Sequence, residues 1–262
     1  MCQGFGMGQG SVSVGPSLAV VLAVLVVVAV TAASIGHLGV SRAVLTAAAR
    51  AVLQLALVSL LITAVLRSWW STAAFIVLMV LVAAVTSARR VSTVRLGWLV
   101  VVPIAAGAAT AGAVVVLGRT MPLTEIAVLP VAGILIGGAM TATSLSGRRA
   151  LDELRARHGE YEAALALGFM PRDAALEVCR PSARQALVPA LDQTRTVGLV
   201  TLPGAFVGVL LGGGSALQAG ATQVLVLVAL LAAEAIAAAI TLELVARGLI
   251  RRPVTGVAFI PS

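Results

Sequence analysis

Lysine is absent from this 262-residue chain, whose 18 basic residues are all arginines. A P-loop places a lysine ammonium against the β- and γ-phosphates of a nucleotide, so the chain holds no ordinary P-loop. The sequence therefore predicts no nucleotide-binding motif and no cofactor in this chain. Any ATP and Mg²⁺ that it depends on are expected on a separate subunit.

Charged and aromatic residues are scarce, at 11% and 3% of the chain, whereas 60% of the residues are hydrophobic. A soluble domain has about 25% charged and about 45–50% apolar residues, so the surplus apolar surface indicates a lipid environment. The net charge of +8 is carried by arginines that lie between apolar runs. That pattern favours membrane orientation and excludes nucleic acid as a partner.

Cysteine and histidine are too few and too scattered for a metal centre. Cys2 and Cys179 form no CxxC pair, and His37 and His158 lie far apart in expected loops. Neither a disulfide framework nor a zinc site is predicted, and no metal ligands are assigned. HExxH, GxSxG and clustered carboxylates are also absent, which argues against a membrane-embedded enzyme.

Seven hydrophobic stretches alternate with the arginines. Most are long enough to cross about 30 Å of hydrocarbon, although the second and sixth are short; they lie at 17–36, 51–66, 69–87, 96–117, 123–146, 196–211 and 220–246. With the N-terminus outside, 16 arginines fall on the inner side and only Arg67 and Arg119 on the outer side. This bias predicts an all-α protein of about seven transmembrane helices in the cell inner (plasma) membrane, N-terminus out and C-terminus in.

The one long hydrophilic stretch, residues 147–195, divides the chain. The predicted organisation is an extracytoplasmic tail (1–16), transmembrane helices one to five (17–146), a cytoplasmic coupling insert (147–195), helices six and seven (196–246) and a cytoplasmic tail (247–262). Apolar residues recur at loosely helical intervals in the insert, which predicts short helices on the inner membrane face. Gly168 suits a helix C′ position, Pro171 suits the first turn of the next helix, and Pro181 is expected to close that helix or open another.

The insert carries a spaced motif: Glu162-Ala163-Ala164, three residues, Gly168, nine residues, and then Val178-Cys179-Arg180-Pro181. It resembles the EAA loop of ABC-transporter permeases, except that Arg180 stands where that pattern has leucine. Two alanines let a partner approach closely, glycine permits a sharp turn between helices, and a glutamate can meet basic groups in a groove of the ATPase. The alternative is an ordinary alanine-rich amphipathic surface loop.

Two further stretches, residues 137–149 and 189–205, narrow the resemblance. They resemble the membrane subunit of the bacterial Fet-type iron-export ABC system, a family that includes the plant aluminium-sensitivity membrane proteins. The resemblance runs from about Arg42 to Arg247. It implies a partner P-loop ATPase, a permease homodimer and the export of iron. The family usually has asparagine where this chain has Gly138, which removes an amide beside the expected pathway.

Several residues inside the predicted spans are candidates for a translocation pathway. Pro203 and Gly204 interrupt span six, and Gly204, Gly208 and Gly212 recur every fourth residue. This predicts either a broken helix that lines the pathway or a close packing seam. Met140, Thr143 and Ser144 share a helical face with Gly147, and they either line a passage for a metal ion or bond back to their own helix.

Acidic residues complete the candidate pathway. Glu234 lies near the centre of span seven, where a charge costs about 2.5 kcal/mol or more, so it is expected to face the bundle or a cavity. Arg50, in the polar stripe Arg42, Thr46, Arg50 and Gln54, either neutralises a carboxylate such as Asp192 or anchors to lipid phosphate. Two other functions remain open: an ABC permease for a lipid, metal chelate or sugar nucleotide, and a stand-alone secondary transporter that uses Glu234.

Overall fold

The protein is described here by a computed structural model, which places residues 15–91 and 95–251. All the regular elements in those ranges are helices, apart from an isolated bridge between Val197 and Thr201. The chain divides into two compact units at Arg67 and Ser68. The all-α prediction is therefore confirmed for the placed residues.

The first unit is a helical hairpin of α1 (Pro16–Ile35) and α2 (Ser41–Val65). Pro16 begins α1 at a position where its missing N–H has no helical partner to lose. The Oγ atoms of Ser34 and Ser41 lie 2.9 Å apart and connect the ends of the two helices. Helix α2 starts ten residues before the predicted second span, because alanine-rich residues 43–51 continue the helix past Arg50.

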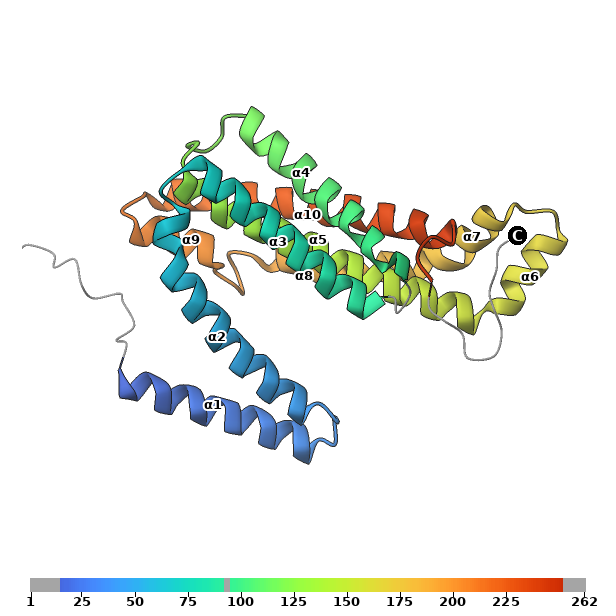
Figure 1. The fold of residues 1–262 in the computed structure, drawn as a ribbon, viewed down its shortest axis with the longest axis horizontal. Coiled ribbons are helices and arrows are strands. Elements are labelled where there is room, and N and C mark those ends of the chain that lie inside the picture. The colour runs from blue at the N-terminus through green and yellow to red at the C-terminus, as the bar shows by residue number, and fades with distance from the viewer. Residues whose placement is uncertain (1–14, 92–94, 252–262) are drawn as a thin grey trace, which may run out of the picture. The chain divides into compact units, whose positions relative to one another are not determined.

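The second unit is a bundle built around two long helices, α5 (Glu125–Ala156) and α10 (Ala216–Ala246). Helices α3 (Trp69–Val91) and α4 (Val101–Leu117) pack against α5, with a short 3₁₀ helix η1 (Arg95–Val100) between them (Figure 1). Helix α4 comes very close to α10, since a Cβ at Gly107 would lie 2.4 Å from the Ala233 carbonyl oxygen. Small residues thus bring the helices of the bundle together.

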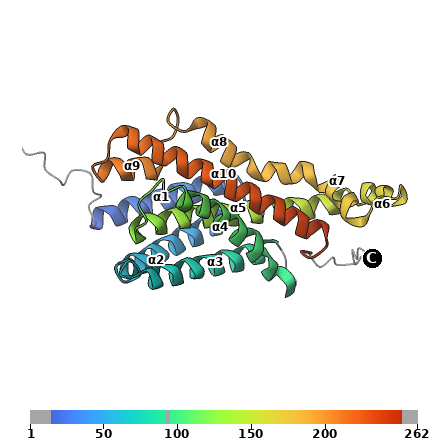
Figure 2. The same cartoon turned by 90° about the horizontal axis from the view of Figure 1, so that it is seen from above.

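Three helices follow α5 and fill most of the predicted insert. Helix α5 runs ten residues beyond the predicted fifth span and ends at Ala156. Helices α6 (His158–Ala166) and α7 (Pro171–Arg184) follow at one end of the bundle, and a 3₁₀ turn η2 (Gln185–Leu187) leads into α8 (Val188–Thr196) (Figure 2). The predicted short helices are therefore present, although the first part of the insert is an extension of α5.

The predicted sixth span, 196–211, is not a single helix. Helix α8 ends at Thr196, an irregular segment follows, and α9 (Gly204–Leu211) has only eight residues. Gly198 has a φ of +83°, and Pro203 is extended with ψ 160°. Proline supplies no N–H and the left-handed glycine breaks the helical path, so the apolar run cannot stay helical throughout.

Six helices among the placed residues are long and apolar enough to cross a membrane. They are α1, α2, α3, α5, α10 and the continuous segment Trp98–Leu117, which contains α4. Each coincides with one of the predicted spans other than the sixth. The chain is therefore a multi-pass membrane protein.

Candidate functional site

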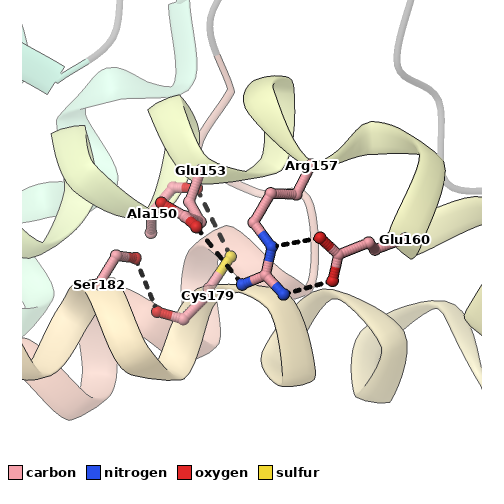
Figure 3. Close-up of polar contacts among 6 residues, drawn as sticks. All are labelled: Ala150, Glu153, Arg157, Glu160, Cys179 and Ser182. Atoms are coloured by element: carbon pink, nitrogen blue, oxygen red, sulfur yellow. Dashed lines mark hydrogen bonds and ion pairs between the residues drawn. The ribbon is translucent and has the colours of Figure 1, made fainter.

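The junction of α5 and α6 is fixed by Arg157 (Figure 3). Its Nε donates to Oε1 of Glu160 at 2.7 Å, its Nη2 contacts the second oxygen of the same carboxylate, and its Nη1 donates to Glu153 at 3.4 Å. The hydrogen bond from Arg157 lowers the pKa of the Glu160 carboxyl and raises the pKa of the arginine. This exposed network sets the direction in which α6 leaves α5.

The turn between α6 and α7 is a Schellman motif centred on Gly168. The Gly168 N–H donates to the Leu165 carbonyl at 2.9 Å, and the Phe169 N–H donates to the Ala164 carbonyl at 3.1 Å. Gly168 has a φ of +91°, and a Cβ there would have no heavy atom within 4 Å. The requirement for glycine is thus conformational rather than steric, and the predicted C′ position is confirmed.

Helix α7 is held on the end of the bundle by its apolar face. Ala174, Ala175, Val178 and Cys179 are buried there, in one cluster with residues of α5 and α10. The Cys179 thiol donates to the Ala150 carbonyl at 3.5 Å, and burial raises its pKa to about 12 (Figure 3). This cysteine is therefore a neutral packing group and not a nucleophile.

Pro181 neither closes α7 nor opens another helix, so that prediction is wrong. The helix continues three residues past it to Arg184. Proline removes one backbone hydrogen bond, but Ser182 and Ala183, which directly follow Pro181, are buried, and Ser182 Oγ donates to the Cys179 carbonyl at 2.9 Å. Packing against the bundle maintains the helix where its own bonding is interrupted.

The other motif residues lie at the end of α6 and in the turn that joins it to α7. We call this region, residues 162–170, the insert tip. Glu162 and Ala163 are exposed and Ala164 is half-buried, while Leu167, Phe169 and Met170 are all exposed. The Glu162 carboxylate lies 3.4 Å from His158 Nδ1. Pro181 is exposed but lies about 15 Å along α7 from its first residue. The structure thus gathers Glu162, Ala163, Ala164 and Gly168 and leaves Pro181 apart.

The polar face of α5 is turned into the bundle. Thr143 and Ser144 are buried, Met140 is half-buried, and Gly147 packs against Val91 and Thr241. Ser144 Oγ donates to Ser87 Oγ of α3 at 3.0 Å, so it bonds across helices and not to its own helix. Thr143 Oγ1 is buried and has no hydrogen-bond partner among the placed residues. This face is a close seam with one unsatisfied hydroxyl.

Glu234 lies in the same bundle, on α10, and is only 8% exposed. Its carboxylate is directed at Gly138 of α5, where a Cβ would lie 2.8 Å from Oε1 and 2.2 Å from a methyl of Leu230. No hydrogen bond or ion pair joins Glu234 to another placed residue. Glycine at position 138 therefore leaves the space that this acidic side chain fills.

The remaining candidates lie on the broken segment. Pro203 and Gly204 begin α9, whose Phe206 N–H donates to Oε1 of the buried Gln223 on α10 at 3.1 Å. Asp192 is exposed on α8 and lies 3.6 Å from Arg195. The structure does not bring Asp192 to Glu234, and among the placed residues no three His, Cys, Asp or Glu side chains are grouped for a metal ion.

Comparison with known proteins agrees with this architecture. The model of the Uncharacterised protein family (UPF0014) matches residues 17–250. The chain belongs to this family. No solved structure matches the chain significantly.

Relatives of the UPF0014 chain include plant and bacterial membrane proteins. It is 36% identical over 217 residues to the UPF0014 membrane protein STAR2 of Oryza sativa subsp. japonica, covering 81% of this chain and 75% of that protein. It is 33% identical to Protein ALUMINUM SENSITIVE 3 of Arabidopsis thaliana, covering 78% and 76%. It is 30% identical over 240 residues to the Probable iron export permease protein FetB of Escherichia coli (strain K12), covering 88% and 90%.

Three polar residues of this UPF0014 chain were not expected from sequence. Gln223 bonds α9, and Arg172 of α7 forms an ion pair with Glu243 of α10. The four-residue spacing of Glu243 and Arg247 could have indicated a pair on one helix face. No periodicity relates Arg172 to Glu243, which lie 71 residues apart.

Proposed function

We propose that this chain is the transmembrane permease subunit of an ABC transporter that exports iron or another metal ion. A separate P-loop ATPase subunit, which holds the ATP and Mg²⁺, supplies the energy. The observation that carries the proposal is the Schellman turn at Gly168, which presents the EAA residues at an exposed tip. The similarity to FetB, whose name describes an iron export permease, supports the cargo.

The insert tip suits a docking contact with the ATPase. Glu162 supplies a negative charge, and Leu167, Phe169 and Met170 supply exposed apolar area on the same turn. A monomeric soluble surface seldom exposes large apolar side chains together without a partner. The 16-to-2 arginine distribution supports a cytoplasmic position for residues 147–195 and 247–262, with residues 1–16 outside.

A seventh crossing follows if residues 196–211, which comprise the end of α8, the irregular segment and α9, together traverse the membrane. Helix α9 packs along α10 through Phe206 and Gln223, and α8 also lies against α10. Helix α9 alone is about 12 Å long and cannot cross. Discontinuous helices of this kind occur where irregular backbone lines a pathway or is covered by protein. This arrangement makes residues 196–246 the last two crossings.

The pathway is formed beside α5 and α10. Met140, Thr143, Ser144 and Glu234 contribute from the bundle, and Asp192, Pro203 and Gly204 contribute from the broken segment. An unpaired acid buried among apolar helices attracts a cation or proton. Two copies of the chain pair with two ATPases, and closing of the ATPase dimer on ATP shifts the spans between inward- and outward-facing states.

Co-purification with a candidate P-loop ATPase subunit from the same cells tests the proposal through one matched pair of variants. Gly168→Val forces a β-branched residue into a left-handed conformation, at roughly 1–2 kcal/mol. Gly159→Val is the control, because Gly159 is exposed in α6, has no positive φ and has equally open space around its Cβ. We expect the wild type and Gly159→Val to retain the ATPase and stimulate its ATP hydrolysis, and Gly168→Val to lose the stimulation.

Glu162→Arg is expected to act like Gly168→Val, because it reverses the charge that the tip presents. If both variants hold the ATPase and transport normally, the EAA assignment is wrong. If the unaltered chain captures no ATPase, the chain is not an ABC subunit, and a secondary transporter using Glu234 becomes the better account.

A further inference from the structure

An ion pair joins the insert directly to the end of α10. Arg172 Nε lies 2.7 Å from Oε1 of Glu243, and Arg172 Nη2 lies 2.8 Å from Oε2, so the guanidinium holds the carboxylate with two parallel hydrogen bonds. Arg172 Nη1 also donates to Asp173 at 2.8 Å. Bidentate arginine–carboxylate pairs fix orientation as well as distance.

The positions of Arg172 and Glu243 indicate what the ion pair connects. Arg172 is the second residue of α7 and lies four residues after Gly168, next to the insert tip. Glu243 lies in the last turn of α10, nine residues, or about 14 Å, from Glu234. The pair therefore connects the element nearest the tip with the helix that carries the buried acid.

The apolar contacts of α7 do not fix its orientation in the same way. Its buried face consists largely of small side chains, including Ala174, Ala175 and Ala183. Such residues permit close approach but provide few interlocking knobs. The planar arginine fork, by contrast, accepts the carboxylate in one geometry. Because both side chains are partly exposed, the pair adds little to stability, and positioning is the role that its geometry supports.

A second arginine provides an internal comparison. Arg247 Nε donates to the same Oε1 of Glu243 at 2.6 Å, but it lies one turn away on the same stretch of chain. Loss of Arg247 removes one partner of Glu243 and leaves α7 connected to α10. Loss of Arg172 removes the ion pair between α7 and α10 and leaves only their apolar contacts.

We propose that Arg172 and Glu243 are positioning residues that transmit movement of the insert tip to α10. The inference rests on the proposed function, because it presupposes that an ATPase moves the tip. When the ATPase displaces α7, the pair makes the end of α10 follow, and the helix carrying Glu234 shifts against Gly138. Without the pair, α7 keeps its apolar contacts but no longer fixes the end of α10 in one orientation, and hydrolysis drives the bundle less effectively.

The test measures ATPase co-purification, ATP hydrolysis and Fe²⁺ transport in proteoliposomes. The variants are Arg172→Gln, Arg247→Gln, the single charge reversals Arg172→Glu and Glu243→Arg, and the exchange that combines the two reversals. Arg172→Gln is expected to bind the ATPase as the wild type does, but to transport at least about fivefold less per ATP hydrolysed, the lower end of a typical coupling between two sites. Arg247→Gln is expected to match the wild type. The exchange is expected to recover transport relative to either single charge reversal.

Equal coupling ratios for Arg172→Gln and Arg247→Gln would overturn the proposal, and so would an exchange variant no better than the single reversals. Failure of the proposed function is distinguishable, because the unaltered chain itself would then capture no ATPase. A uniform loss of purified protein from Arg172→Gln would show a folding role and would also overturn the proposal.

Discussion

Gly138 has no side chain, and the Glu234 side chain lies in the space that this leaves. The Glu234 carboxylate occupies the space beside Gly138, and no charged group of α3, α4 or α5 stands at this level of the bundle. Helix α4 contains no ionisable residue, and α5 contains none between Glu125 and Arg148. Leu230 and Ala233 pack around the same position. The acid is therefore isolated in an apolar layer, where its charged form costs free energy.

Replacing Glu234 with glutamine tests whether its charge serves transport or whether its side chain only fills space. We expect Glu234→Gln to preserve thermal stability and ATPase co-purification, because it keeps the side chain's volume and removes a charge that costs about 2.5–3.5 kcal/mol. Transport is expected to fall roughly tenfold or more, equivalent to about 1.4 kcal/mol of barrier, or to lose its pH dependence. Gly138→Ala is expected to reduce transport as well, since its Cβ would displace the carboxylate.

The measurement is the rate of Fe²⁺ transport at several pH values, with Gly137→Ala as the control. Gly137 is the neighbouring glycine on α5, and a Cβ there would meet no heavy atom within 4 Å. Unchanged transport by Glu234→Gln across the pH range would assign Glu234 to packing alone.

The sequence predicted the conformation or burial of a single residue only where its neighbours in the chain decide it. The left-handed conformation of Gly168 follows from its place between a helix and a proline three residues later, and the structure has it. The burial of Glu234 follows from its depth in an apolar run. The Arg172–Glu243 pair depends on how α7 folds back on α10, and the bond between Ser144 and Ser87 depends on helix packing. Neither has a local signal.

At the scale of elements, apolar length predicted the six continuous helices, while the sixth predicted span, 196–211, is interrupted, as one of the two interpretations of Pro203 and Gly204 had it. Residues 196–211 are apolar enough for a span, but hydropathy says nothing about Gly198 and Pro203 acting on the backbone. The reverse happened at Pro181, where packing against α5 and α10 preserves a helix that local rules would end. Tertiary contacts determined the outcome at Pro181, and these are not visible in one sequence.

The broken segment makes a testable prediction about crossings. If residues 196–211 traverse the membrane, Arg180 and Ala216 lie on opposite faces. In a chain lacking Cys2 and Cys179, Arg180→Cys should react with an impermeant thiol reagent only from the cytoplasmic side. Ala216→Cys should react only from outside, since both positions are exposed. Reaction of both from one side would leave six crossings and contradict the proposed topology.

At the scale of the whole molecule, composition carried the most reliable information. The low charge and the arginine distribution indicated a membrane protein, and the family match across residues 17–250 places it among UPF0014 membrane proteins. Each of the two units has a clear internal structure. Only a few polar residues bear on which cargo the protein carries. For this reason the substrate is harder to infer than the class of protein.

The most direct test of the central claim is metal transport by purified components in proteoliposomes. The chain, the candidate ATPase and ATP are each omitted in turn, and Fe²⁺ movement is measured with and without an imposed proton gradient. We predict movement only when all three are present, with little effect of the gradient alone. Movement at the same rate without the ATPase, driven by the proton gradient, would contradict the account and show a stand-alone secondary transporter.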